Sequence, residues 1–156
     1  MAAADGQVAR IRELAARTRA LAPAFADRLT PADPDDGDQW DEGQVLAHIA
    51  EFLPYWTGQF QAIVTAGGGI DFGRVKTTPA RIARIEAGRH EPAAVLLDRM
   101  DAAVEVAAAY LESLNEEQLQ LVGIHPTRGE MAVSAGVDRF MIDHFEEHVA
   151  QMEEGS

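Results

Sequence analysis

Residues 137–152, VDRFMIDHFEEHVAQM, carry the clearest structural signal in this sequence, because their apolar residues recur at the spacing of one helical face. An α-helix advances about 100° per residue, so a stripe about 80° wide collects apolar side chains together with two histidines. The members of this stripe are Val137, Met141, His144, His148 and Met152. Most charged residues fall on the other side. We therefore expect a helix over about 133–153 with both imidazoles on its buried face.

The same spacing of apolar residues predicts three more long helices, at about 7–28, 41–66 and 92–114. A short helix is expected at 79–87, because Pro79 suits the first position of a helix. Helix-sized segments joined by loops indicate an all-α fold. We predict a single domain over residues 1–156, a four-helix bundle with a short extra helix between the second and third long helices.

Local signals place several boundaries of these helices. Asp41 and Gln44 have the identities and spacing of a capping box, which marks a helix start. Pro23 should kink or end the first helix, and Pro54 should bend the second. The run Gly67-Gly68-Gly69 should stop the second helix, and Gly136 could mark a close contact between helices.

The remaining segments show no helical spacing. Thr30–Gln39 contains two prolines and four aspartates and is expected to be a loop. Residues 115–130 contain Gly123, Pro126 and Gly129 and are predicted to be irregular. No segment shows a clear strand pattern.

Composition excludes several classes of function. The chain of 156 residues has 13 Lys+Arg and 26 Asp+Glu, a net charge of −13 that repels nucleic acid and anionic membrane surfaces. It has no cysteine, which excludes thiolate metal sites and a cysteine nucleophile. No apolar run approaches the ~20 residues of a membrane span, and the first residues lack the apolar core of a signal peptide. The expectation is a cytoplasmic protein with no nucleic-acid or membrane partner.

Three histidines indicate a metal site. His144 and His148 are four residues apart, so their rings stack one turn above the other. His48 lies on the margin of the apolar stripe of the second long helix and should point near the core. Buried imidazoles without partners cost about 1–3 kcal/mol each, and a divalent cation would satisfy them. Nitrogen ligands suit zinc, nickel, iron and copper alike, and three of them leave coordination positions open for chemistry.

Other interpretations of these histidines remain open. Each could be a core residue bonded to a carbonyl or carboxylate, in a bundle that binds no metal. Residues 144–148, HFEEH, match the string of inverted zinc proteases, but that site needs another ligand well downstream and only eight residues follow. The glutamate-before-histidine pattern of di-iron bundles is absent.

Three stretches resemble the DinB-like, or YfiT-like, superfamily of metalloenzymes. They are WDEGQVLAH at 40–48, HPTRGE at 125–130 and DHFEEHVAQM at 143–152. The likeness spans almost the whole chain. It implies a four-helix bundle, one divalent ion (Zn, Ni, Fe or Mn) held by His48, His144 and His148, and a homodimer. It also implies a small-molecule substrate, since some relatives are S-transferases or isomerases that use bacillithiol, mycothiol or glutathione.

The leading hypothesis is a metal-dependent enzyme, either a low-molecular-weight-thiol S-transferase or a hydrolase. Tyr55 and Gln59, on the flank of His48, are expected to line the substrate pocket, together with His125 at its mouth. Arg128 could meet an anionic substrate. No catalytic residue is assigned, although the helical angles place Glu51 and Glu147 near the histidines. The alternative is a non-catalytic, metal-binding, stress-related bundle protein.

Overall fold

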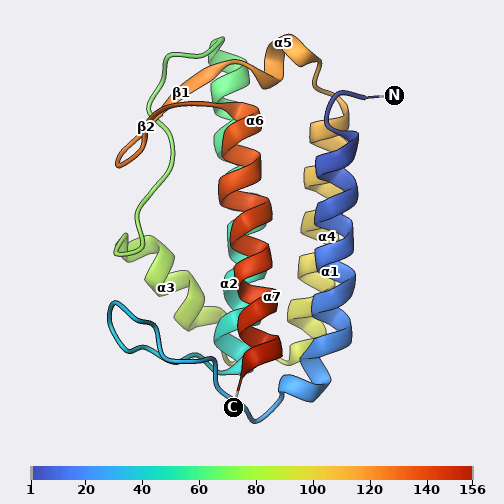
Figure 1. The fold of residues 1–156 in the computed structure, drawn as a ribbon, viewed down its shortest axis with the longest axis vertical. Coiled ribbons are helices and arrows are strands. Elements are labelled where there is room, and N and C mark those ends of the chain that lie inside the picture. The colour runs from blue at the N-terminus through green and yellow to red at the C-terminus, as the bar shows by residue number, and fades with distance from the viewer. Residues whose placement is uncertain (1, 156) are drawn as a thin grey trace.

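Four long helices run side by side in the computed structural model, which describes residues 2–155 (Figure 1). The predicted all-α four-helix bundle is confirmed. The helices are α1 (Asp5–Phe25), α2 (Glu42–Ala66), α3 (Pro79–Gly88), α4 (Ala93–Glu112), α5 (Glu116–Leu119), α6 (Val133–Gly136), the π-helical segment η1 (Val137–Asp143) and α7 (His144–Glu154). The segments α6, η1 and α7 follow one another without a break and form the fourth long helix, here called the C-terminal helix. Within the described residues, no helix has the length and apolar content needed to cross a membrane.

The helix boundaries follow the local chemistry that predicted them. Asp41 accepts a hydrogen bond from the Gln44 backbone at 2.8 Å, and the Gln44 side chain accepts one from the Asp41 backbone at 3.0 Å, so the capping box is present. Gly67 ends α2 in the left-handed conformation. The first helix ends at Phe25, two residues after Pro23, rather than at Arg28 as predicted.

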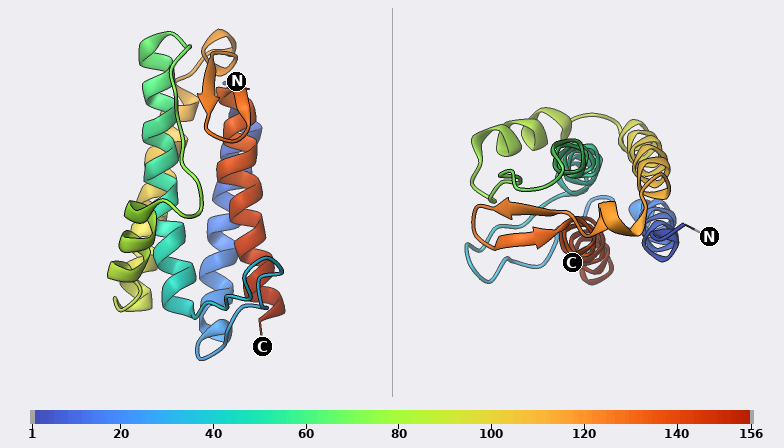
Figure 2. Two further views of the ribbon diagram at one scale, coloured as in Figure 1. Left: turned by 90° about the vertical axis from the view of Figure 1, so that its left-hand side faces the viewer. Right: turned by 90° about the horizontal axis from the view of Figure 1, so that it is seen from above.

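The chain direction explains the long connection between α2 and α4. Colour along the ribbon shows α1 and the C-terminal helix running one way, and α2 and α4 running the other (Figures 1 and 2). Because α2 and α4 are neighbours and parallel, the chain must return along the bundle between them. Residues 67–78 and the short helix α3 make this return outside α2, where the extra helix was predicted.

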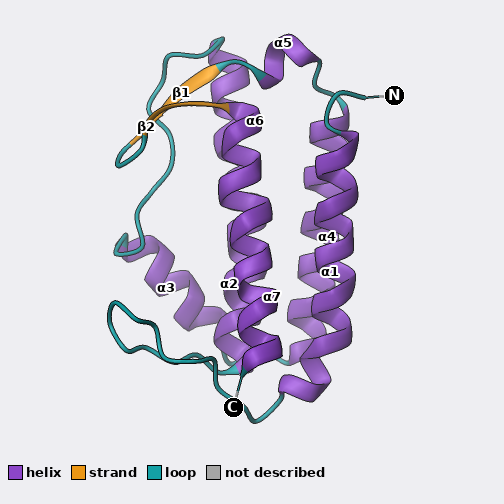
Figure 3. Ribbon diagram, viewed as in Figure 1, coloured by secondary structure: helices purple, strands orange, loops and turns teal. Residues whose placement is uncertain are grey.

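A β-hairpin corrects the prediction that residues 115–130 are irregular and that no strand is present (Figure 3). Strand β1 (Val122–His125) pairs antiparallel with β2 (Gly129–Ala132), with Val122 opposite Ala132 and His125 opposite Gly129. Backbone hydrogen bonds join Ile124 to Ile70 and Phe72 of the return segment. The hairpin and the return segment therefore form one wall beside α2.

The core fills the space between the four long helices. Its largest fully buried side chains come from every one of them, and they include Ile11, Leu14, Phe52, Phe60, Leu96, Met100 and Phe145. Gly136 is the close contact that the sequence suggested, because a Cβ there would lie 2.7 Å from the ring of Phe60. The C-terminal helix is thereby held against α2, and their facing sides carry the three histidines.

Candidate metal centre

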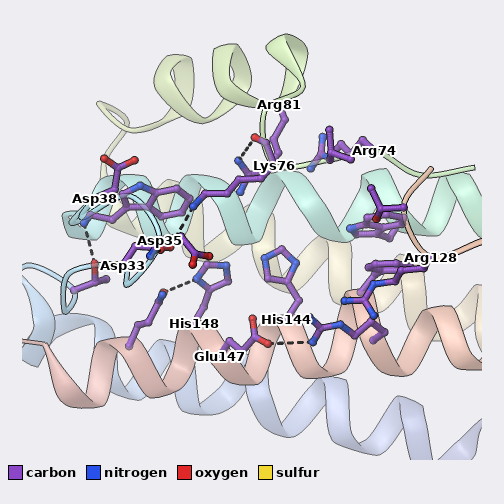
Figure 4. A pocket seen from close by; sticks show the side chains of 18 of the residues that line it. Asp33, Asp35, Asp38, Arg74, Lys76, Arg81, Arg128, His144, Glu147 and His148 are labelled. Atoms are coloured by element: carbon purple, nitrogen blue, oxygen red, sulfur yellow. Dashed lines mark hydrogen bonds and ion pairs between the residues drawn. The ribbon is translucent and has the colours of Figure 1, made fainter. Parts of the chain in front are cut away.

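Two elements bring the predicted histidines together. His48 comes from the first half of α2, and His144 and His148 come from α7, where Figure 4 shows both rings pointing away from the helix and toward α2. One nitrogen of each ring lies within 4.8 Å of the others. The Nε2 atoms of His48 and His144 are 3.0 Å apart. His48 and His148 are buried and His144 is half-buried.

The π-helical segment η1 immediately precedes His144 and was not predicted from the sequence. A π-helix bonds each N–H five residues back instead of four, and such turns are frequent at functional sites. Ideal α-helical angles counted from Val137 therefore do not apply exactly to His144. The four-residue spacing from His144 to His148 lies inside regular α7, so the two rings still share one face.

Neighbouring side chains orient the rings. Nδ1 of His148 lies 2.9 Å from Oε1 of Gln151, so Nδ1 carries the proton and Nε2 keeps a free lone pair. Nδ1 of His48 lies 3.6 Å from Oε1 of Glu51, just beyond hydrogen-bond distance. Glu51 is itself held by both ends of the Arg74 guanidinium. Such outer contacts fix the ring orientation of metal-binding histidines.

Burial keeps the three imidazoles neutral. Desolvation lowers the pKa of His148 to about 4. Desolvation and the nearby His148 also hold the pKa values of His48 and His144 well below the ordinary 6.5. Near pH 7 each ring therefore offers a lone pair rather than a positive charge.

The donor set fits a divalent ion. Nε2 of His148 has no hydrogen-bond partner among the described residues, and the Nε2 atoms of His48 and His144 face each other at 3.0 Å. Nitrogens bound to one ion at about 2.0–2.1 Å lie about 3.0–3.4 Å apart, so this separation suits two ligands of one ion. Three neutral imidazoles are a common donor set for zinc and other divalent transition metals.

Aromatic side chains enclose the histidines. The ring of Phe52 stacks on His144 with centroids 4.6 Å apart, and Trp40 stacks on His148 at 5.9 Å. Trp40 also meets His48 edge-on at 5.4 Å. These contacts limit the rotation of the imidazoles and keep one side of the cluster apolar.

A cavity of about 590 Å³ opens beside the histidines (Figure 4). Its walls come from the 30–40 loop, α2, the return segment, α3, the hairpin and the C-terminal helix. The lining residues are Thr30, Pro31, Asp33, Asp35, Asp38, Trp40, Trp56, Arg74, Val75, Lys76, Arg81, His125, Thr127, Arg128, Arg139, Phe140, His144, Glu147, His148 and Gln151. A small molecule entering this space would meet two of the three histidines directly.

Two of the four predicted pocket residues line this cavity, and two do not. His125 and Arg128 are on its wall. Tyr55 lies under the guanidinium of Arg74, 3.9 Å from ring centroid to Cζ, and the Gln59 side chain accepts a hydrogen bond from the Gly73 backbone at 2.8 Å. Both therefore contact the return segment, which itself contributes residues 74–76 to the cavity wall.

His125 lies on the cavity wall and is buried. Its Nδ1 accepts hydrogen bonds from the backbones of Thr127 and Arg128, at 3.2 and 3.3 Å. Its ring stacks on Phe140 at 4.7 Å. Burial lowers the pKa of His125, and the charge of Arg128 lowers it further. The ring is thus neutral and shapes the turn of the hairpin.

The two glutamates near the histidines differ in their surroundings. The Glu51 side chain is only 8% exposed and contacts both His48 and Arg74. Glu147 is exposed and pairs with Arg139 at 3.1 Å. Glu51 can therefore orient the imidazole of His48, whereas Glu147 contributes surface charge at the rim of the cavity.

Sequence reasoning missed several residues of the site. Gln151 follows His148 by three residues, a spacing that places it on the same face of the helix and could have identified it. Arg74 and Arg81 come from the return segment and α3, which contact the site only through the fold. Nothing in the local sequence identifies these two residues.

The sequence model of the DinB superfamily matches residues 10–152. The structure is similar to YfiT from Bacillus subtilis, described as a probable metal-dependent hydrolase with an unusual four-helix bundle topology. That match has a TM-score of 0.77 and 16% identity, and covers 96% of this chain and 83% of YfiT.

The structure is also similar to a mycothiol-dependent maleylpyruvate isomerase, with a TM-score of 0.73 and 10% identity. The match covers 96% of this chain and 60% of the isomerase, so this chain corresponds to only part of that enzyme. No curated protein sequence matches the chain.

Proposed function

This chain belongs to the DinB superfamily, and from that premise we propose that it is a metal-dependent enzyme acting on a small molecule. One divalent ion would be held by His48, His144 and His148. The reaction would be S-transfer of a low-molecular-weight thiol, or a hydrolysis. The observation that carries the proposal is the convergence of three neutral imidazoles at a cavity of about 590 Å³.

The chain's own residues would prepare the site in distinct ways. Gln151 holds the tautomer of His148 that directs its free lone pair at Nε2, and Glu51 lies where it can orient His48. Trp40 and Phe52 keep water from one side of the rings. When bound, the ion would lower the pKa of a coordinated water or thiol and so supply an anionic nucleophile near pH 7.

The similar structures support this class of reaction. YfiT is described as a probable metal-dependent hydrolase, and the isomerase depends on mycothiol, a thiol cofactor. The first favours hydrolysis and the second favours chemistry on a thiol. The metal would be zinc, nickel, iron or manganese, and elemental analysis of the purified protein identifies it.

Metal binding is tested by exchanging one histidine at a time. We expect about one equivalent of metal in the wild-type protein and none in His144→Ala, because two nitrogens hold an ion far more weakly than three. His90→Ala is the matched control, since the His90 side chain is 76% exposed and lies outside the cavity. A full equivalent of metal in folded His144→Ala would contradict the ligand assignment.

Catalysis is tested separately on the metal-loaded protein. Electrophiles bearing a chloride or epoxide are offered together with cellular thiols, and ester and amide substrates are offered alone. We expect turnover in one of these two sets, lost in His144→Ala and retained in His90→Ala. Absence of metal-dependent turnover in both sets would count against the enzyme and for the alternative below.

A non-catalytic metal-binding bundle is the second candidate, because an ion at this site would join α2 to α7. Removal of the metal by a chelator separates the two functions in part. If helical circular dichroism collapses when the ion is removed, the ion holds the bundle together. If the helices survive, the ion is free to serve chemistry, as the proposed enzyme requires.

A further inference from the structure

Positive charge is concentrated around the cavity of an otherwise acidic chain. The net charge is −13, yet five of the 13 Lys and Arg residues line this one space. They are Arg74, Lys76, Arg81, Arg128 and Arg139. A cavity that collects cations against the overall charge of the protein attracts anions locally.

Three of these five cations already have carboxylate partners. The pairs are Arg74 with Glu51, Lys76 with Asp33 and Asp36, and Arg139 with Glu147. Their charges are therefore neutralised within the protein. They shape the wall of the cavity but have less to offer to a ligand.

Arg81 and Arg128 differ from the other three, because neither forms an ion pair with a carboxylate of residues 2–155. Nη1 of Arg81 donates to the backbone oxygen of Lys76 at 2.9 Å, and its Nη2 lies 3.5 Å from Nε2 of His48. The guanidinium of Arg128 lies 5.8 Å from the ring centroid of Phe140, at the exposed mouth of the cavity. Arg81 is thus a half-buried cation next to the histidine cluster.

A half-buried guanidinium without a counter-ion is unfavourable, and the neighbouring charge makes it more so. Burial and then the charge of Arg74 lower the pKa of Arg81, and the charge of Glu51 opposes them only in part. A divalent ion at the histidines would add a second cation beside it. An anionic group that contacts Arg81 would relieve both effects, and the planar guanidinium suits a carboxylate or phosphate.

The acidic residues of the cavity favour one orientation for such a group. Asp33, Asp35 and Asp38 lie at the opposite end of the cavity from Arg74 and Arg128, with the histidines between them (Figure 4). Carboxylates at that end repel an anion. The anionic part of a ligand would therefore lie on the arginine side of the histidines.

We propose that Arg81 is the centre of an oxyanion subsite, which holds a carboxylate or phosphate group of the substrate beside the histidine cluster, while Arg128 attracts that group at the cavity mouth. The inference rests on the proposed function and adds the substrate class, a small anionic molecule. Arg81 is a specificity-determining residue in this scheme. It selects and orients the substrate, and it takes no part in holding the ion.

The protein carries its own reporter for this subsite. Trp40 and Trp56 are its two tryptophans, and both line the cavity. The ring of Trp40 lies 6.0 Å from Cζ of Arg81. Intrinsic tryptophan fluorescence therefore reports on the cavity without any label.

The experiment titrates succinate, inorganic phosphate and the neutral analogue succinamide into the protein, in metal-free and metal-loaded forms. The variants are Arg81→Gln and the control Arg84→Gln, an exposed arginine on the same helix that does not line the cavity. We expect a saturable fluorescence change with succinate or phosphate, weakened at least about tenfold by Arg81→Gln and unchanged by Arg84→Gln. Whichever anion depends on Arg81 identifies the group as carboxylate or phosphate.

Several outcomes would overturn the subsite. They are equal affinities in Arg81→Gln and Arg84→Gln, binding of succinamide as tight as that of succinate, and no saturable change with either anion. Arg81→Lys serves if Arg81→Gln does not fold, because it keeps the charge and loses the planar fork, so intermediate weakening is expected.

Metal content is measured on the same samples. If the protein takes up a full equivalent of metal but anion binding does not depend on Arg81, only the subsite is wrong. If anion binding depends on Arg81 but the protein takes up no metal when metal is offered, only the proposed metal function is wrong.

Discussion

The two halves of this bundle treat buried polar groups differently. Where α1 meets α4, the buried side chains are apolar apart from Thr18, whose hydroxyl donates to the Leu14 carbonyl of its own helix at 2.9 Å. Where α2 meets α7, His48 and His148 are buried beside His144. Nδ1 of His48 and Nε2 of His148 have no hydrogen-bond partner among residues 2–155. The first half is built as a stable core. The second retains groups that destabilise the metal-free chain and become favourable only with a ligand.

The surfaces of the two halves differ in the same way. Arg19 of α1 reaches Asp98 and Asp101 of α4 across an exposed surface. On the other half, Arg81 and Arg128 face a cavity without a carboxylate partner in the described chain. The contrast is therefore between a surface arginine that has carboxylate partners and two cavity arginines that have none among the described residues, which favours an anionic ligand in the cavity.

The largest effect that separates the halves is expected from Leu14→Ala, which removes a fully buried side chain of α1. The lost contacts and the cavity left behind should cost about 2–5 kcal/mol of the free energy of unfolding. Metal content should not change, because Leu14 lies outside the site. Urea denaturation of the metal-free protein and elemental analysis measure the two quantities. Loss of metal from the folded variant would show that the halves are coupled rather than separate.

The regular parts of both halves were predictable from the sequence because their signals are local. Helical spacing of apolar residues predicted the four long helices, and the four-residue spacing of His144 and His148 predicted a shared face. The capping box at Asp41 and Gln44 placed the start of α2 within one residue. These features depend on neighbours within one or two turns, so no long-range information was needed.

The parts that were missed depend on the assembled fold. In β1 the inward residues are Gly123 and His125 and the outward residues are Val122 and Ile124, so hydrophobic alternation gives no hint of which face is buried. The π-helical turn of η1 changes the spacing too little over seven residues to detect. Arg81 reaches the histidines only because the chain must return past α2 between two parallel helices.

Acidification should destabilise the metal-free protein through the histidine half. The folded pKa of His148 is about 4 against an ordinary 6.5, so between these values the unfolded chain binds a proton that the folded chain does not. Stability contributed by neutral His148 is therefore complete above about pH 6.5, and it falls by about 1.4 kcal/mol for each pH unit between about 6.5 and about 4. The lowered pKa values of His48 and His144 act in the same direction.

The measurement is the urea midpoint of metal-free protein between pH 7.5 and 5, compared with His148→Leu. The urea midpoint of His148→Leu should fall less steeply as the pH decreases, because the variant lacks the contribution of about one bound proton. The midpoint of His90→Leu should follow the wild-type curve because that side chain is exposed. Equal slopes in all three proteins would mean that His148 is protonated in the folded state.

A smaller effect is expected on stability near pH 8, where the histidines are neutral in both states. In His148→Leu, an apolar side chain takes the place of a buried imidazole whose Nε2 has no hydrogen-bond partner in the described part of the chain. The metal-free variant should be more stable than the wild type by about 1 kcal/mol, while its metal binding is lost. Urea denaturation with a chelator present tests this. A variant less stable than the wild type would mean that the bond to Gln151 outweighs the unpartnered nitrogen.

The smallest effect is expected from Arg19→Ala, at the ion pairs that join α1 to α4. Water screens these charges, because the side chains of Arg19 and Asp101 are 45% and 47% exposed. Ordering two long side chains also costs entropy, so an exposed pair gains little from its close geometry. The urea midpoint should stay within the error of repeated measurements at low and high salt, and metal content should not change. A clear, salt-dependent fall in the midpoint would mean that the α1–α4 half also relies on polar contacts, and the contrast between the halves would then rest on the histidines alone.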